Sequence, residues 1–231
     1  MNGCRFLVTG GSQGIGEAIV DAACRQGHDV TFTGRNQKLI EGVADRTGAR
    51  GIQADVSQPS DNARTVDACL RASGGIDVLV NNAGFGLGEP IGELDVAAMR
   101  RLFDTNVFGL VDLTNRVVPL MKKQRQGDIV NIASTSGMKG HAGGTAYSAS
   151  KWAVRGISQC WQAELRPHDI RVVSICPSEV QTAWGGKTER DNPNKLYATD
   201  IADAVLASIA VDRRALWPEL AIFATNPWKE T

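Results

Sequence analysis

The chain has no excess charge of either sign and no cluster of basic residues. Its 25 lysines and arginines balance 25 aspartates and glutamates, so its formal net charge at pH 7 is zero. Proteins that bind nucleic acid or an anionic membrane surface through charge ordinarily carry a concentrated basic patch. The composition therefore argues against a nucleic-acid partner or a membrane partner and favours a small molecule.

Long apolar runs and paired cysteines are also absent. No run reaches the roughly 18 apolar residues that a membrane-spanning helix needs, and the segment after Met1 lacks the regions of a signal peptide. The cysteines are odd in number, widely separated and free of any C-x-x-C pair, which argues against a disulfide framework and a structural zinc site. We therefore expect reduced, mostly buried thiols, no metal site and a cytoplasmic protein. They stand at Cys4, Cys24, Cys69, Cys160 and Cys176.

What the chain does have is enough apolar sequence for one core, with 42% hydrophobic residues in a length of 231. Strand-like segments alternate with helical ones, and this alternation predicts βαβ units and a parallel sheet. We expect one domain spanning residues 1–231, a doubly wound α/β fold with about seven parallel strands and helices on both faces. The expected strands are Arg5–Thr9, Asp29–Thr33, Ala49–Gln53, Ile76–Val80, Asp128–Ala133, Ile170–Cys176 and a short one at Ala221–Ala224.

Glycines gather between the first expected strand and the first expected helix, where residues 10–16 read Gly-Gly-Ser-Gln-Gly-Ile-Gly. Glycine lets the backbone turn sharply and approach a ligand closely, and the helix N-terminus offers free N–H groups to an anion. The spacing G-x-x-x-G-x-G differs from the dinucleotide fingerprint G-x-G-x-x-G, and a plain tight turn would use the same residues. The position between strand and helix favours binding of a phosphate group.

Polar or glycine-rich segments also follow other expected strands. These are Gly34-Arg35, Asp55, residues 81–84 (Asn-Asn-Ala-Gly) and residues 134–137 (Ser-Thr-Ser-Gly). Ligands of parallel sheets gather at the carboxyl ends of the strands. The sequence therefore predicts that these segments line one crevice with the glycine turn.

Tyr147 and Lys151 stand four residues apart at the start of an apolar helical run. On a helix this spacing places both side chains on one face, one turn apart. A nearby cation favours the phenolate and lowers the tyrosine pKa from about 10, so that the phenol exchanges a proton near neutral pH. Such pairs also occur on helices by chance, so the spacing alone leaves both interpretations open.

Two other polar residues fit a site at the same edge. Asn106 interrupts the apolar stripe of an expected helix at 96–123. Because a buried amide must be hydrogen-bonded, it is either a core asparagine bonded to neighbouring backbone or a holder of an ordered water. Ser134 follows the fifth strand, thirteen residues before Tyr147. It is ordinarily a turn residue, but at this edge it would bond a substrate oxygen.

These motifs, taken in order, closely resemble the short-chain dehydrogenase/reductase family over nearly the whole chain. The resemblance implies a Rossmann-type fold and hydride transfer between a nicotinamide and a carbonyl or alcohol substrate. It implies that Tyr147 is the general acid or base, that Lys151 lowers its pKa and holds the nicotinamide ribose, that Ser134 positions the substrate oxygen, and that Asn106 anchors a relay water. The implied cofactor residues, besides Tyr147 and Lys151, are Gly10, Ser12, Gln13, Gly14, Ile15, Gly16, Arg35, Asp55, Val56, Asn82, Ala83, Gly84, Pro177, Val180 and Thr182.

The end of the second strand predicts the choice of cofactor. An NAD site places a carboxylate there, but the chain has Gly34 and then Arg35. Gly34 would leave room for the extra phosphate of NADP, and the guanidinium of Arg35 would grip it with two charge-assisted hydrogen bonds. The alternative is that Arg35 only points into solvent. We expect NADP(H) to be preferred over NAD(H), and moderately so, since Gln13 stands where many NADP-preferring relatives carry a basic residue.

The substrate end departs from the family pattern at Ser178, where a glycine is usual, and in a short flap at about 183–195. Three residues would lie near the substrate, namely Ser136, His141 and Trp184. His141 would line the mouth of the crevice without transferring protons, or it would be an ordinary exposed loop histidine.

The resemblance also implies assembly, because in this family the helices that carry the apolar stripes Met99–Leu120 and Trp152–Leu165 pair about a two-fold axis. We expect a homodimer or homotetramer, and the alternative is that both helices simply cover their own sheet. A second candidate function is a non-catalytic NADP(H)-binding sensor on the same fold. The presence of both Tyr147 and Lys151 favours the enzyme.

Overall fold

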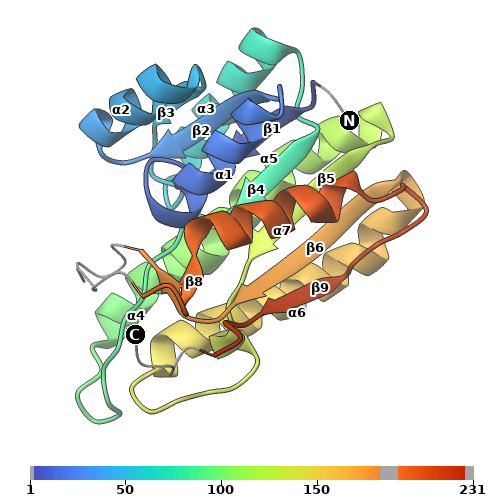
Figure 1. Ribbon diagram of the computed structural model, residues 1–231. Coiled ribbons are helices and arrows are strands. Elements are labelled where there is room, and N and C mark those ends of the chain that lie inside the picture. Colours follow the sequence, from blue (N-terminus) through green and yellow to red (C-terminus); the bar gives the residue numbers. More distant parts are fainter. Residues whose placement is uncertain (1–2, 183–191, 227–231) are drawn as a thin grey trace.

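A computed structural model describes residues 3–182 and 192–226 of the chain. Its centre is a seven-stranded parallel sheet in the order β3-β2-β1-β4-β5-β6-β9 (Figure 1). This order reverses direction between β1 and β4, as in doubly wound folds. The strands are β1 (Arg5–Val8), β2 (Asp29–Gly34), β3 (Arg50–Gln53), β4 (Val78–Asn81), β5 (Gly127–Ile132), β6 (Ile170–Pro177) and β9 (Glu219–Ile222).

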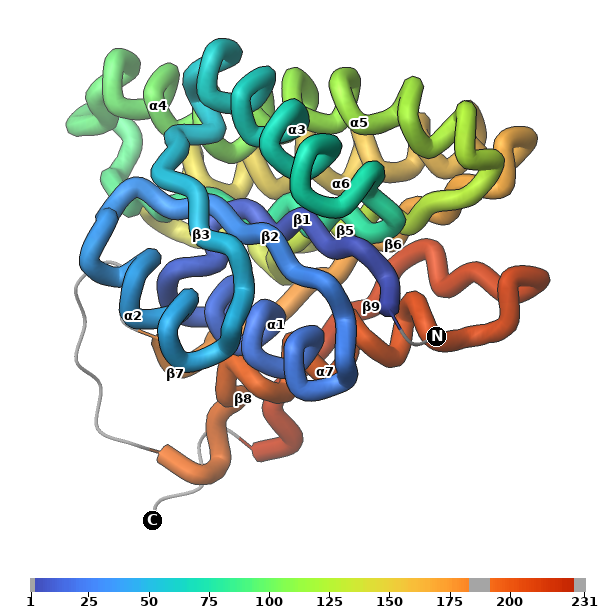
Figure 2. Tube along the Cα trace, turned by 90° about the horizontal axis from the view of Figure 1, so that it is seen from above, coloured from blue at the N-terminus to red at the C-terminus, as the bar shows by residue number. Residues whose placement is uncertain are grey.

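Helices cover both faces of the sheet, which makes three layers (Figure 2). Helices α1, α2 and α7 lie on one face, and α3, α4, α5 and α6 lie on the other. A separate pair of short parallel strands, β7 (Val180–Gln181) and β8 (Leu196–Tyr197), lies near the start of α7. The helices are α1 (Gly14–Arg25), α2 (Gln37–Thr47), α3 (Pro59–Ser73), α4 (Val96–Phe103), α5 (Leu110–Gln124), α6 (Thr145–Leu165) and α7 (Ala198–Ala210).

The core consists of apolar clusters on the two faces of the sheet. In β1 the side chains alternate, so that Phe6 and Val8 pack with α1 and α7 while Leu7 packs with α3 and α5. A parallel sheet covered on both faces buries every strand position, and all residues of β5 and β6 are buried. The prediction of a single α/β domain with seven parallel strands is confirmed.

Two predicted elements differ in detail. The expected helix at 96–123 is divided into α4 and α5 by a π-helical turn, Asp104–Gly109. Gly109 lies so close to the β3–α3 loop that a Cβ atom there would be 2.4 Å from the Val56 carbonyl oxygen. The last strand lies two residues earlier than the predicted 221–224, because a four-residue edge strand has too little periodicity to define its register.

The cysteines are all free, but their burial is mixed. Cys69 and Cys176 are buried, Cys160 is exposed, and the other two are intermediate, so the expectation of mostly buried thiols holds for only part of the set. Across residues 3–182 and 192–226, no helix combines the length and the apolar character needed to cross a membrane.

Candidate active site

The glycine turn joins β1 to α1 at the carboxyl edge of the sheet. Gly10 and Gly14 have φ angles of +64° and +58°, a backbone region that side chains other than glycine rarely adopt. A Cβ atom on Gly16 would lie 2.2 Å from the carbonyl oxygen of Gly10. The three glycines therefore allow the turn to close tightly on the first turn of α1.

The N-terminus of α1 is uncapped by any side chain. Its N-cap residue, Gln13, makes no side-chain cap hydrogen bond, whereas Asn36 caps α2 and Asp95 caps α4. The first N–H groups of a helix need an acceptor, and an anion such as a phosphate supplies one. Residues 13–16 therefore fit the pyrophosphate of a dinucleotide.

Asn82 fastens the end of β4 to this turn. Its amide nitrogen donates to the carbonyl oxygens of Thr9 at 2.9 Å and Gly10 at 3.2 Å. The Thr9 hydroxyl accepts in return from the backbone N–H groups of Asn82 and Ala83, each at 3.0 Å. The Asn82 side chain thus holds the glycine turn in place, and a cofactor ribose would meet the backbone beyond it, toward Gly84.

The end of β2 packs against the glycine turn. A Cβ atom on Gly34 would lie 2.5 Å from Oγ of Ser12 and 2.9 Å from its Cβ. A side chain at position 34 would therefore meet Ser12, and that Gly34 leaves room for the NADP phosphate stays a prediction. Arg35 follows at the surface, where its carbonyl accepts from Gln53 at 3.0 Å and its guanidinium bonds none of the described residues.

The loop after β3 lies beside β2, since the Ala54 N–H donates to the Gly34 carbonyl at 2.9 Å. The carboxylate of Asp55 accepts from the N–H and the hydroxyl of Ser57 at 3.0 and 2.8 Å, while Val56 is buried. Both residues therefore stand at the carboxyl edge, as predicted, with the Asp55 side chain bonded within its own turn.

Tyr147, Lys151 and Ser134 meet where α6 packs on β5. The Lys151 side chain is buried, and its Nζ donates to the Ile132 carbonyl at 2.8 Å. The same Nζ lies 5.7 Å from the centroid of the Tyr147 ring. The Ser134 hydroxyl lies near enough to the Tyr147 phenol to lower the tyrosine pKa as a hydrogen-bond donor. The three predicted residues thus form one constellation.

The pKa values in this constellation follow from burial. Burial lowers the pKa of Lys151 from its ordinary 10.5 to about 8. Burial also raises the pKa of Tyr147, and the hydrogen bond from Ser134 opposes that rise. This differs from the expectation that Lys151 lowers the tyrosine pKa, because the ammonium faces a backbone carbonyl and the ring.

Asn106 lies in the π-helical turn and is buried. Its Nδ2 donates to the Phe85 carbonyl at 3.0 Å and to the Ser150 hydroxyl at 3.1 Å, and its Oδ1 accepts from the Phe85 N–H at 3.0 Å. The side chain is thus bonded to neighbouring backbone, and the implied role of Asn106 in anchoring a relay water stays a prediction. The side chain ties the loop after β4 to α6, and both of its donor hydrogens are used.

The candidate substrate residues Ser136 and His141 both lie between β5 and α6. This segment lies beside the loop after β4, where the Glu89 N–H donates to the Gly143 carbonyl at 3.0 Å. His141 is exposed, and its Nε2 lies 3.4 Å from the Ser136 hydroxyl. The predicted Trp184 and residues 183–191 of the predicted flap lie outside the described residues.

The segment that follows β6 reaches the glycine turn. Pro177 ends β6, Val180 opens β7 and packs against the core, and Thr182 lies 3.5 Å from the Cβ position of Gly14. The structure therefore brings the predicted nicotinamide end next to the predicted phosphate turn.

Three residues at the site were not identified from the sequence. Thr9 and Ser150 bond Asn82 and Asn106, as described above, and Arg155 bonds the turn that follows Ser134. Arg155 stands four residues after Lys151, the same spacing that links Lys151 to Tyr147. This repeated spacing of four could have indicated from the sequence that Arg155 lies near the site.

Known proteins are similar to this chain in sequence and in structure. Residues 5–193 match the family model described as short chain dehydrogenase. An uncharacterised oxidoreductase of Staphylococcus saprophyticus is 37% identical over 209 residues, which cover 88% of this chain and 89% of that protein. An uncharacterised oxidoreductase of Staphylococcus epidermidis is 34% identical over 205 residues, with coverage of 88% and 89%.

Two solved structures are similar along almost their whole length. The closed form of a serine dehydrogenase complexed with NADP+ has a TM-score of 0.88 and 31% identity, with 94% of both chains covered. Serine dehydrogenase from Escherichia coli has a TM-score of 0.86 and 32% identity, covering 94% of this chain and 96% of that one. Fold and site together define a Rossmann-type oxidoreductase that binds a nicotinamide cofactor. The chain belongs to the short-chain dehydrogenase family.

Proposed function

We propose that the protein transfers a hydride between NADP(H) and a carbonyl or secondary alcohol substrate. The observation that carries this proposal is that Tyr147, Ser134 and Lys151 meet at the carboxyl edge of the sheet. The glycine turn at the same edge leads into a helix N-terminus without a side-chain cap, which fits a phosphate group. The bound nicotinamide would supply the hydride in reduction and accept it in oxidation.

The chain's own residues would handle the proton. In reduction, the Tyr147 hydroxyl gives its proton to the substrate oxygen as the alcohol forms, and in oxidation the phenolate takes that proton back. The Ser134 hydroxyl lies beside the Tyr147 phenol, so a substrate oxygen that accepts a hydrogen bond from both hydroxyls would be in position for the transfer. Lys151, whose buried Nζ lies 5.7 Å from the centroid of the Tyr147 ring, would hold the nicotinamide ribose beside the phenol.

Arg35 supports a preference for NADP(H). Its exposed guanidinium follows β2 at the edge where a dinucleotide fold places the adenosine ribose, and a free guanidinium binds phosphate through paired hydrogen bonds. A serine dehydrogenase that is 31% identical was solved with NADP+, which is consistent with this assignment.

A homodimer or homotetramer is proposed from the outer faces of the helices. Val96 and Phe108 are each 60% exposed and Trp152 is 51% exposed, and apolar area of this kind is buried in subunit contacts. Light scattering at micromolar concentration checks the assembly, and a monomer mass would refute it.

A cytoplasmic location agrees with the five free cysteines.

An absorbance assay of NADPH consumption tests the function. The panel should contain ketones, aldehydes and 3-oxoacyl thioesters, with serine as an alcohol in the oxidative direction because two structural relatives are serine dehydrogenases. For any substrate found, Tyr147→Phe should reduce turnover by at least about a hundredfold with cofactor affinity unchanged, since it removes the proton donor but little volume. Turnover retained in that variant would defeat the proposal.

A further inference from the structure

Arg155 continues the line of active-site residues along α6. It lies one turn beyond Lys151, as Lys151 lies one turn beyond Tyr147, so the three share a helix face. Its side chain is 15% exposed and forms a two-pronged ion pair, with Nε 2.7 Å from Oε2 of Glu219 and Nη2 2.8 Å from Oε1. Glu219 opens the edge strand β9, so the pair ties α6 to that strand.

The remaining guanidinium nitrogen of Arg155 reaches the serine turn. Nη1 donates to the carbonyl of Gly137, the last residue of the 3-10 turn Thr135–Gly137. Ser134 is the N-cap of this turn, with its hydroxyl accepting from the Ser136 N–H at 3.1 Å. The Gly137 N–H donates back to the Ser134 carbonyl at 2.9 Å. Arg155 therefore bonds one end of a turn whose other end carries Ser134.

The turn is also pressed against α6. A Cβ atom on Gly137 would lie 2.6 Å from the Lys151 carbonyl oxygen and 3.1 Å from Cδ of Arg155. No larger residue fits between the turn and the helix. The position of the turn is therefore set by the helix face that carries Lys151 and Arg155.

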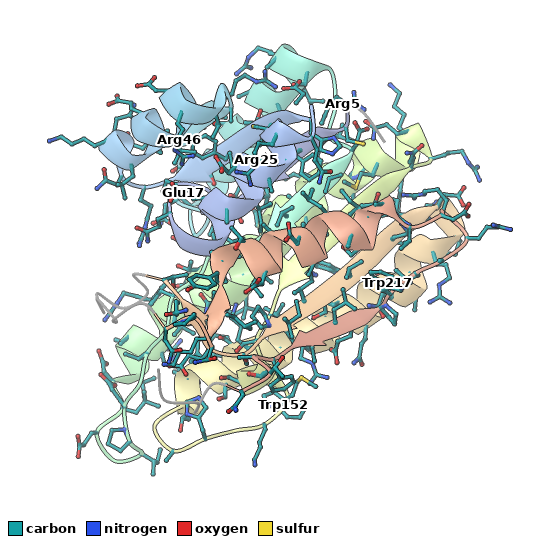
Figure 3. The ribbon with its side chains drawn as sticks, viewed as in Figure 1. Arg5, Glu17, Arg25, Arg46, Trp152 and Trp217 are labelled. Atoms are coloured by element: carbon teal, nitrogen blue, oxygen red, sulfur yellow. The ribbon has the colours of Figure 1, made fainter. Side chains whose placement is uncertain are left out.

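Cys176 and Trp152 complete the surroundings of Arg155. Cys176 is buried beside Arg155 and Ser134, and burial raises the pKa of its thiol. The Trp152 ring lies 5.5 Å from Cζ of the guanidinium and stands on α6 at the lower edge of the molecule in Figure 3. The titratable and charged groups around the turn are thus Tyr147, Lys151, Arg155, Cys176 and Glu219, together with His141, whose Nε2 lies 3.4 Å from the Ser136 hydroxyl, and Lys139, whose N–H donates to the Thr135 carbonyl at 3.1 Å.

We propose, on the basis of the proposed function, that Arg155, oriented by Glu219, is a positioning residue that holds the Ser134 hydroxyl against Tyr147. A guanidinium is planar, so two prongs fixed on one carboxylate also fix the direction of the third nitrogen. That third direction determines where the Gly137 carbonyl lies and, through the turn, where Ser134 lies. A lysine ammonium carries the same charge without this fixed geometry.

The chain offers a matched control for this pair. Arg5 and Asp77 also form a two-pronged pair, at 2.8 and 2.6 Å, with side chains 28% and 24% exposed. They stand at the amino ends of β1 and β4, the sheet edge opposite to the site, and Figure 3 places Arg5 far from Trp152. Asp77→Asn therefore reports the loss of a comparable ion pair without contact to the serine turn.

The test compares Glu219→Gln and Arg155→Lys with Asp77→Asn in two measurements. The first is the pH profile of kcat/KM for alcohol oxidation. Since the Ser134 hydrogen bond lowers the pKa of Tyr147, loosening that bond should move the profile's midpoint upward by about half to one pH unit. The second is amide hydrogen exchange of residues 134–139 in the protein without substrate, which should become roughly tenfold faster.

The control should lose thermal stability but keep its pH midpoint and its exchange rate in the serine turn. If Glu219→Gln and Arg155→Lys also lose only thermal stability, the pair is merely structural and the inference is overturned. If the unmodified protein shows no turnover that depends on Tyr147, the proposed function fails, and the exchange measurement still decides whether Arg155 holds the turn.

Discussion

The Nζ atom of Lys151 donates a 2.8 Å hydrogen bond to the carbonyl oxygen of Ile132, the last residue of β5. This bond aims a buried ammonium across the end of the central strand. Burial lowers the pKa of Lys151 to about 8, because this single carbonyl compensates only part of the hydration that burial removes.

Lys151→Met should change how stability depends on pH. The folded pKa of Lys151 is lowered from 10.5 to about 8, so between these values the unfolded chain binds more protons than the folded one. The free energy of unfolding should therefore contain a contribution from Lys151 that rises with pH across this window. Urea unfolding of both proteins at several pH values measures this contribution. The free energy of unfolding of the unmodified protein minus that of Lys151→Met should fall as pH falls from 10.5 to about 8, because the variant lacks the titrating lysine. Parallel curves would contradict the buried, low-pKa lysine.

Gly34→Asp, a natural choice for converting the cofactor preference, should destabilise the fold. Its Cβ would lie 2.5 Å from Ser12 Oγ, and overpacking of this kind costs about 1–3 kcal/mol. The melting temperature should fall by roughly 2–4 °C for each kcal/mol in a chain of this size. Ser12→Gly in the same chain should restore most of the loss.

The matched control for this substitution is Gly42→Asp on α2. A Cβ atom on Gly42 meets nothing within 4 Å, so its melting temperature should stay close to that of the unmodified protein. Equal losses from Gly34→Asp and Gly42→Asp would show that Ser12 does not obstruct position 34.

Arg35→Ala should weaken the binding of NADPH and leave the binding of NADH nearly unchanged. The guanidinium bonds none of the described residues, so its removal breaks no hydrogen bond or ion pair among them. Losing even one charge-assisted hydrogen bond to the phosphate should raise the dissociation constant for NADPH about tenfold or more. Calorimetric titration with each cofactor measures this, and equal weakening of both would show that Arg35 does not select the phosphate.

His141→Ala should change substrate selection without changing the proton pathway. The imidazole contacts Ser136 at 3.4 Å and the Ala142 carbonyl at 3.1 Å, and it makes no described contact with Tyr147. Michaelis constants should therefore shift unequally across a substrate series, while the pH profile that depends on Tyr147 stays in place. A displaced pH profile would assign His141 to proton transfer.

The architecture was predictable because its signals are local. Alternating strand-like and helical segments indicate a parallel sheet, and strand ends in such a sheet meet at one edge. The glycine turn, residues 81–84 after β4 and the pair Tyr147 and Lys151 could therefore be assigned to one crevice from their order alone. Spacing of four on a helix also placed Tyr147 and Lys151 on one face.

The contacts within that crevice were decided by tertiary packing. Which partner a polar side chain takes depends on the atoms that other elements bring to it, and those atoms are distant in sequence. Packing thus placed Ser12 beside Gly34, gave the Asn106 amide to the Phe85 backbone, and turned Lys151 toward Ile132. The pKa values depend on both levels. The residue types set the ordinary pKa values of Tyr147 and Lys151, whereas burial determines the direction in which each pKa is shifted. Burial arises only once the chain has folded, so the tertiary structure decided these shifts.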